Sequence, residues 1–277
     1  MVTSTPKSNV LLPIRHRQQE LFICDVADAV LKNDMASMEH PIFSLATRPD
    51  LKERVYQHGD TRLVVTPSVK GMATIYDKDI LIFAISQLIA ARNAGEQVKQ
   101  EVSLSARSFL VFANRHTGGS DYSQLEAALD RLTGTRLRTT IVTGGERQES
   151  WFGLVESASV VRVGGFGRIR ELRIKLSDWL FNAINSQEVL TMHPDYFRLR
   201  KPMERRIYEI ARKHCGRQRE WKVGVALLYK KTGSRSPLKQ FRYLLKELAE
   251  QNHLPDYSLS LSHDGDSVQF HNRSMRT

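Results

Sequence analysis

The predicted helices and strands follow the same order in both halves of this 277-residue chain, and that order limits the folds available to it. Apolar residues spaced three and four apart predict three consecutive helices in each half. In the first half these helices cover residues 77–95, 106–116 and 122–134. In the second half they cover residues 202–216, 221–233 and 237–252.

Strands follow the third helix in each half, joined by turns that contain glycine. They are predicted at residues 136–142, 150–163 and 169–176 in the first half, and as a hairpin at residues 257–271 in the second. Three helices followed by paired strands is the order of a winged helix, in which the third helix is the candidate recognition helix. The sequence therefore predicts an α+β chain of two tandem winged-helix domains.

The predicted boundary between the two domains lies around the segment QEVLTMHPDYF. We assign residues 36–190 to the first winged-helix domain and residues 191–277 to the second. Residues 1–35 form an N-terminal lead-in, and apolar spacing predicts a short helix within residues 18–34. Two further elements of the first domain are a strand at residues 61–67 and a closing helix at residues 176–186.

The excess positive charge of the chain lies in one segment. The net charge is +11, from 41 Lys and Arg against 30 Asp and Glu. Residues 196–252 contain 16 basic and 5 acidic residues, and the rest of the chain carries 25 of each. Solubility does not require this concentration, whereas a surface that binds a polyanion does. On charge alone, a well-solvated basic face stays open as the other interpretation.

None of the common catalytic motifs occurs in the sequence. The chain lacks a phosphate-binding loop, the closely spaced histidine pair of a metal-dependent nickase, and the zinc-protease, serine-hydrolase and paired-cysteine motifs. We therefore expect no catalytic residue, no cofactor and no metal site. There is also no run of 18 apolar residues, so no membrane span is expected. The two distant cysteines, Cys24 and Cys215, suit a reducing cytoplasm.

The helix predicted at residues 237–252 has two different faces. Apolar residues spaced three and four apart define a buried face: Leu238, Phe241, Leu245 and Leu248. Basic residues recur at the same spacing, about 100° round the helix: Lys239, Arg242 and Lys246. Further polar side chains gather around the helix start: Ser234, Arg235, Ser236 as the predicted cap, and Gln240. This pattern fits either a recognition helix or an amphipathic helix with a solvated basic face.

These residue types suit both kinds of contact that proteins make with DNA. An arginine at the start of a recognition helix, such as Arg235 or Arg242, can hold guanine O6 and N7. Gln240 and the two serines can read other base edges, and free backbone N–H groups at the helix start suit a phosphate. Lysines further along, such as Lys246, are expected to meet phosphates. The basic helix before this one and the hairpin after it favour DNA binding.

Phosphate contacts are also predicted outside this helix. Four basic residues of the second half would give an affinity that falls with salt: Arg205, Arg206, Lys230 and Lys231. In the first half, Arg136 and Arg138 in the strand GTRLRTT are candidates for phosphate or minor-groove contacts, and an ordinary strand edge explains them equally well. The third helix of the first half is largely acidic on its polar side, which makes it a poor reader of the major groove.

Four segments carry long and distinctive runs of sequence. They are HPIFSLATRPDLKERVYQHGDTRLVVTPSVKGMATIYDKDILIFAISQL (40–88), LSARSFLVFANRHTGGSDYSQLEAALDRLTGTRLRTTI (104–141), RLRKPMERRIYEIARKHCG (198–216) and LYKKTGSRSPLKQFRYLLKEL (228–248). These runs closely resemble the plasmid replication initiator protein A family. The resemblance covers roughly residues 36–262, and TPSVKGMATIYDKDIL is its most specific part.

The resemblance implies a bacterial plasmid protein that binds repeated double-stranded DNA sequences (iterons) at a replication origin through two winged-helix domains. The C-terminal domain would read the major groove, and the N-terminal domain would add contacts and form a homodimer interface. Such proteins help to melt an adjacent A·T-rich region and bring in the host initiator and the replicative helicase. The dimer often represses its own gene, while the monomer initiates. The expected location is the bacterial cytoplasm, on plasmid or nucleoid DNA.

Two other functions stay open at this point. A two-domain winged-helix transcriptional repressor would share every DNA-binding feature, and binding to tandem direct repeats rather than to one palindrome would distinguish the initiator from it. A nicking enzyme is the third hypothesis. The missing histidine pair argues against it, and incubation of supercoiled plasmid with Mg²⁺ or Mn²⁺ tests it.

Overall fold

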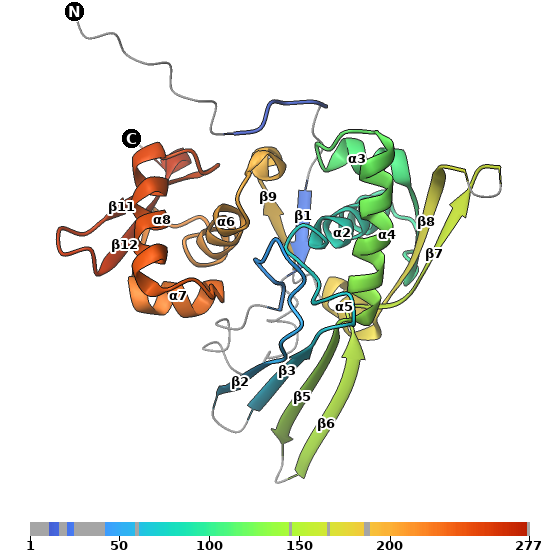
Figure 1. Cartoon of the computed structure of the whole chain (residues 1–277), viewed down its shortest axis with the longest axis horizontal. Helices are drawn as coiled ribbons and strands as arrows, with labels where there is room; N and C mark the ends of the chain where they lie inside the picture. Colours follow the sequence, from blue (N-terminus) through green and yellow to red (C-terminus); the bar gives the residue numbers. More distant parts are fainter. Residues whose placement is uncertain are drawn as a thin grey trace, which may run out of the picture.

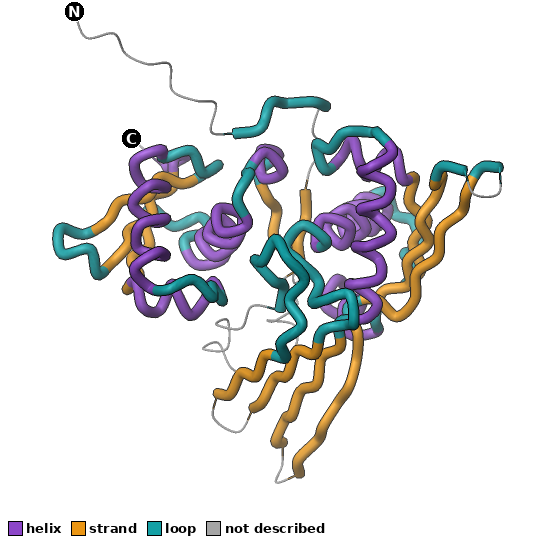
Figure 2. Tube along the Cα trace, viewed as in Figure 1, coloured by secondary structure: helices purple, strands orange, loops and turns teal. Residues whose placement is uncertain are grey.

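The structure, a computed structural model, describes residues 11–16, 21–24, 42–58, 61–143, 146–164, 167–185 and 189–275 (Figure 1). Within these residues the chain forms seven α-helices and four small sheets, and all paired strands are antiparallel. Figure 2 shows one group of helices from each half of the chain, with most of the strands on the outside. The fold is therefore a mixture of helices and small antiparallel sheets, in line with the predicted α+β class.

Helix α2 (Lys78–Asn93) is the centre of the N-terminal half. Strand β1 (Leu21–Cys24), strand β4 (Glu101–Ser105) and helix α3 (Ala106–Phe112) all contact it. Because neighbours cover it on several sides, every residue from Lys78 to Ile89 is buried except Gln87.

Helix α3 begins at the residue that the sequence predicts. The Ser105 hydroxyl caps α3 by accepting a hydrogen bond from the Ser108 N–H at 3.2 Å. Helix α4 (Gly119–Gly134) begins at Gly119, whereas the sequence predicts residue 122, and it buries an apolar stripe: Leu125, Ala128, Leu129 and Leu132. Asp77 directly precedes α2, and its carboxylate accepts two hydrogen bonds of 2.7 Å from Arg131 on α4. That ion pair ties the start of α2 to α4.

Two sheets flank these helices. One has the strand order β2-β3-β5-β6 and the other β4-β8-β7. The single strand predicted at residues 150–163 is two strands in different sheets, because the chain bends at the buried Leu154. At Gly153 a Cβ would lie 2.9 Å from the Val155 carbonyl oxygen, so glycine permits this bend. The strands are β2 (Arg54–His58), β3 (Thr61–Thr66), β5 (Arg136–Thr143), β6 (Glu146–Gly153), β7 (Val155–Arg162) and β8 (Ile169–Leu176).

The C-terminal half begins with helix α6 (Pro202–His214), which has proline in its first turn as predicted. The helix predicted at residues 221–233 is instead strand β10 (Glu220–Gly224) followed by helix α7 (Val225–Thr232). Strand β10 pairs with β12 (Ser267–Asn272), and this pairing takes those residues out of the helix. Helix α8 (Leu238–Gln251) and the predicted hairpin of β11 (Tyr257–Leu261) and β12 complete the half.

The helix predicted at residues 18–34 is wrong at residues 21–24, which the structure describes. Residues 21–24 form β1, which pairs with β9 (Val189–Met192), and the other residues of the helix predicted at 18–34 lie outside the described part of the chain. The partner strand supplies backbone hydrogen bonds that a local apolar pattern does not reveal. The closing helix of the first half, α5 (Asp178–Asn185), is confirmed, with the Ser177 hydroxyl near its first turn.

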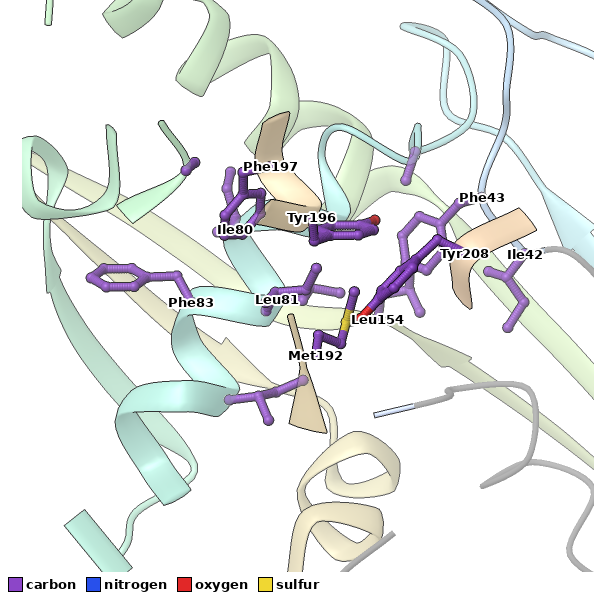
Figure 3. Packing of buried hydrophobic residues seen from close by; sticks show 14 of the residues in the cluster. Ile42, Phe43, Ile80, Leu81, Phe83, Leu154, Met192, Tyr196, Phe197 and Tyr208 are labelled. Atoms are coloured by element: carbon purple, nitrogen blue, oxygen red, sulfur yellow. The ribbon is translucent and has the colours of Figure 1, made fainter. Parts of the chain in front are cut away.

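The two halves share a buried junction. Figure 3 shows Phe197 beside Ile80 and Tyr196 near Leu81 of α2, with Tyr208 on the other side of Tyr196. Each of these five residues is at most 1% exposed. Charged side chains are buried there too. Asp79 accepts hydrogen bonds from Arg205 at 2.8 and 3.0 Å and from Arg115 at 2.8 Å. Lys78 meets Glu209 at 3.0 Å. This junction fixes α6 against α2.

Candidate nucleic-acid interface

Helix α8 has an exposed polar face on the opposite side from its buried residues. Phe241, Leu245 and Leu248 are buried as predicted, whereas Leu238 in the first turn is 39% exposed, against the prediction. The α8 polar face consists of Lys239, Gln240, Tyr243 and Lys246, all exposed. Tyr243 is absent from the residues predicted to contact DNA. Its spacing of four from Lys239 and three from Lys246 places it on the same face, and this spacing is the signal that identifies it.

The start of α8 leaves backbone donors available. Pro237 occupies the cap position, and no side chain among the described residues caps the helix, so Ser236 is not the cap that the sequence predicts. The Ser236 carbonyl oxygen instead accepts a hydrogen bond of 2.7 Å from the Tyr229 hydroxyl, and the Ser236 N–H donates to the Ser234 hydroxyl at 3.3 Å. The first N–H groups of a helix have no partner within it. The uncapped first turn of α8 is therefore suited to an anion.

Arg242 connects α8 to the neighbouring hairpin. Its guanidinium donates to the Gly265 carbonyl oxygen and to the Asp266 carboxylate, each at 2.8 Å. Gly265 adopts a φ of +71° in the turn between β11 and β12, a conformation that favours glycine. In this structure Arg242 therefore holds the hairpin turn, and does not point outward with the α8 polar face.

Arg235 contacts the N-terminal half. One guanidinium nitrogen lies 2.7 Å from the Asp50 carboxylate, which also accepts a hydrogen bond of 2.8 Å from Arg54. Burial alone would raise the pKa of Asp50. The hydrogen bonds from Arg54 and the Lys52 N–H, with the positive charges of Arg54 and Arg235, outweigh burial and lower this pKa. Asp50 is therefore an anionic anchor for the turn that precedes α8.

The Asp50 anchor predicts a pH dependence of stability. A carboxyl with a lowered pKa stabilises the folded chain fully above its ordinary pKa, which is 3.8 for Asp50. That contribution disappears as the pH falls through the lower pKa of the folded state. We expect Asp50→Asn to lower the free energy of unfolding at pH 7, and the difference from the unmodified chain to shrink below about pH 4. Urea unfolding between pH 3 and 7 measures it, and a difference that does not vary with pH would contradict the assignment.

Three of the four predicted phosphate-binding residues do not lie on an open surface. Arg205 is 4% exposed and bound to Asp79, with its guanidinium 4.7 Å from the centre of the Tyr76 ring. The Arg206 side chain is 13% exposed and donates to the Lys231 carbonyl oxygen at 2.9 Å. Lys231 is 7% exposed. Their predicted phosphate contacts are therefore not available in this structure, and only Lys230 of the four is exposed.

Arg136 and Arg138 lie on strand β5, in the four-stranded sheet below the helices in Figure 1. Arg136 is exposed, while Arg138 is partly buried, with its guanidinium 6.0 Å from the centre of the Trp151 ring. Both residues belong to a different part of the molecule from α8. The structure therefore does not join them to the α8 polar face.

The described part of the chain contains no group of three or more His, Cys, Asp or Glu side chains placed to hold a metal ion. Among the same residues, no helix combines the length and apolar character needed to cross a membrane.

Comparison with known proteins identifies the family. The family model described as Replication initiator protein A matches residues 32–259. The chain belongs to the replication initiator protein A family. The matched residues nearly coincide with residues 36–262, which carry the resemblance in the sequence. The predicted family is therefore confirmed.

One relative agrees with this family, and two solved structures share the fold. A protein of Wigglesworthia glossinidia brevipalpis, described provisionally as a replication protein, is 37% identical over 271 residues, which span 96% of this chain and 98% of that protein. Two crystal structures of domains 2 and 3 of RctB have a similar fold. One has a TM-score of 0.64 at 15% identity and covers 88% of this chain and 97% of that one. The other has a TM-score of 0.59 at 14% identity and covers 84% and 94%.

Proposed function

We propose that this initiator binds the repeated sequences of a plasmid origin through a winged helix in its C-terminal half. The observation that carries the proposal is the α8 polar face, which lies beside a hairpin that Arg242 ties to the same helix. The elements α6, β10, α7, α8, β11 and β12 follow the order of a winged helix, with β10 as the third strand of the small sheet.

In this mechanism α8 lies in the major groove. Gln240 sits in the first turn, where recognition-helix side chains reach base edges, and its amide can hold adenine N6 and N7 together. Lys239 and Tyr243 flank it on the same exposed face. Lys246 and Lys230 contact phosphates, with the uncapped N–H groups of α8. Arg242 positions the hairpin as the wing.

The proposed initiation step needs no covalent chemistry. Several copies bound to neighbouring repeats bend the DNA, and the bending lowers the cost of opening the adjacent A·T-rich duplex. The exposed surfaces of the bound copies then receive the host initiator and the replicative helicase. We propose that a dimer of the same protein represses its own gene. We assign the protein no enzymatic step, no cofactor and no metal.

A repressor, the second candidate function, would share the α8 polar face. Footprinting distinguishes an initiator from a simple repressor by the DNA sites that are protected. We expect the full-length protein to protect several direct repeats at regular spacing in its origin DNA, with specific binding about 10³-fold or more tighter than binding to random DNA. Protection of a single palindrome in front of the gene, with no repeats bound, would instead identify the protein as a repressor.

A further inference from the structure

A cleft of about 580 Å³ separates strand β2 from the turn between α7 and α8. Its N-terminal wall includes Lys52, Arg54 and Gln57, and its C-terminal wall includes Lys230, Ser234 and Arg235. The two walls come from different halves of the chain (Figure 1). The cleft also lies directly beside the proposed DNA-binding helix, because Arg235 is three residues before Leu238, where α8 begins.

The cleft is lined by four basic side chains and one acidic side chain, Glu53. The Glu53 carboxylate accepts a hydrogen bond of 3.0 Å from the Thr66 hydroxyl. Lys52 and Lys230 are both exposed, and within the described residues no acidic side chain pairs with either ammonium group. Two lysines from opposite walls therefore offer positive charge to a ligand between them.

The other two basic side chains of the cleft already bind an anionic group of the protein itself. Arg54 and Arg235 both point to one carboxylate, that of Asp50, at 2.8 and 2.7 Å. The Asp50 side chain is only 2% exposed and does not line the cleft, so it holds both guanidinium groups without occupying the cleft itself. Asp50 is thus a positioning residue, and the lysines remain for an external anion.

We infer that the cleft binds the phosphodiester backbone of the DNA whose bases α8 reads, with Lys52 as the contact contributed by the N-terminal half. This inference rests on the proposed function. Nucleic acid fits the cleft better than an acidic protein segment because the cleft is continuous with the exposed start of α8. One stretch of backbone then contacts both halves of the chain, and the Asp50 anchor keeps the two cleft walls at a fixed separation.

The test compares salt dependence of DNA binding for Lys52→Gln, Lys230→Gln and the double variant in the full-length chain. The matched control is Lys99→Gln, an exposed lysine between α2 and β4 outside the cleft. Each cleft variant should bind origin DNA and random DNA more weakly by the same factor. The slope of log K against log salt should fall by about 1 for each lysine removed, and not for the control. Thermal melting of all four variants should match the unmodified chain, because these lysines are exposed.

Parallel titrations of Gln240→Ala separate this inference from the proposed function. If Lys52→Gln keeps the slope of the control while Gln240→Ala loses affinity for origin DNA, the cleft does not bind backbone, although α8 still reads DNA. If neither variant changes binding, both the cleft and the α8 assignment are wrong. A reduced slope for Lys52→Gln supports the cleft.

Discussion

Asp79→Ala should lower the free energy of unfolding by about 3–5 kcal/mol, the cost of removing one partner from a buried ion pair. The Asp79 side chain is fully buried, and it receives hydrogen bonds from Arg205 and Arg115. Without it, two guanidinium groups lose their counter-charge, and the Arg205 side chain is only 5% exposed. Urea unfolding measures the change. The expected effect is large because Asp79 lies in the buried junction between the two halves, where α6 packs on α2.

Two controls accompany Asp79→Ala. Arg205→Met should cost less, because Asp79 keeps Arg115 as a partner and methionine fills part of the apolar space. Asp266→Ala removes an exposed partner of Arg242 and should cost about 0–1 kcal/mol. A loss below about 1 kcal/mol for Asp79→Ala would show that the junction opens to water.

The exposed part of the candidate site follows from local periodicity. Lys239, Gln240 and Lys246 are exposed because they lie away from Phe241, Leu245 and Leu248 on the same helix, and a 3.6-residue repeat reveals that directly. The same repeat places Tyr243 among them. A search for charge alone passes over a tyrosine.

The partners of the basic residues do not follow from local pattern. Arg205 pairs with a residue 126 positions away, and Arg235 with one 185 positions away. A count of lysines and arginines cannot separate those that hold the fold together from those that face solvent. One signal does exist for Asp79, since a charge beside the long apolar run of α2 needs a buried partner.

The secondary structure shows the same difference between local and long-range contacts. Helices with their own apolar stripe, such as α4 and α6, lie close to their predicted positions. Short segments whose structure depends on a distant strand do not, and β1 and β10 are the examples. In both segments the apolar residues have helical spacing, but pairing with β9 or β12 makes each segment a strand.

Gln240→Ala should lose about 1–3 kcal/mol of binding to origin DNA, roughly 5- to 150-fold, and much less to a shuffled duplex. The reason is that its amide reads a base edge in the proposed complex. Lys246→Gln should weaken binding to both duplexes alike, because a phosphate contact carries no sequence information. Gln87→Ala, an exposed glutamine on α2 in the other half, is the matched control and should bind both duplexes like the unmodified chain.

The most direct test of DNA reading by α8 is the ratio of affinities for origin and shuffled DNA, measured for the unmodified chain and Gln240→Ala at several salt concentrations. The proposed function predicts that this ratio falls for Gln240→Ala while the salt slope stays the same. An unchanged ratio, in a protein that still binds its origin, would contradict it. The basic residues of α8 would then form a solvated face or a surface for another protein, and a different element would read the DNA.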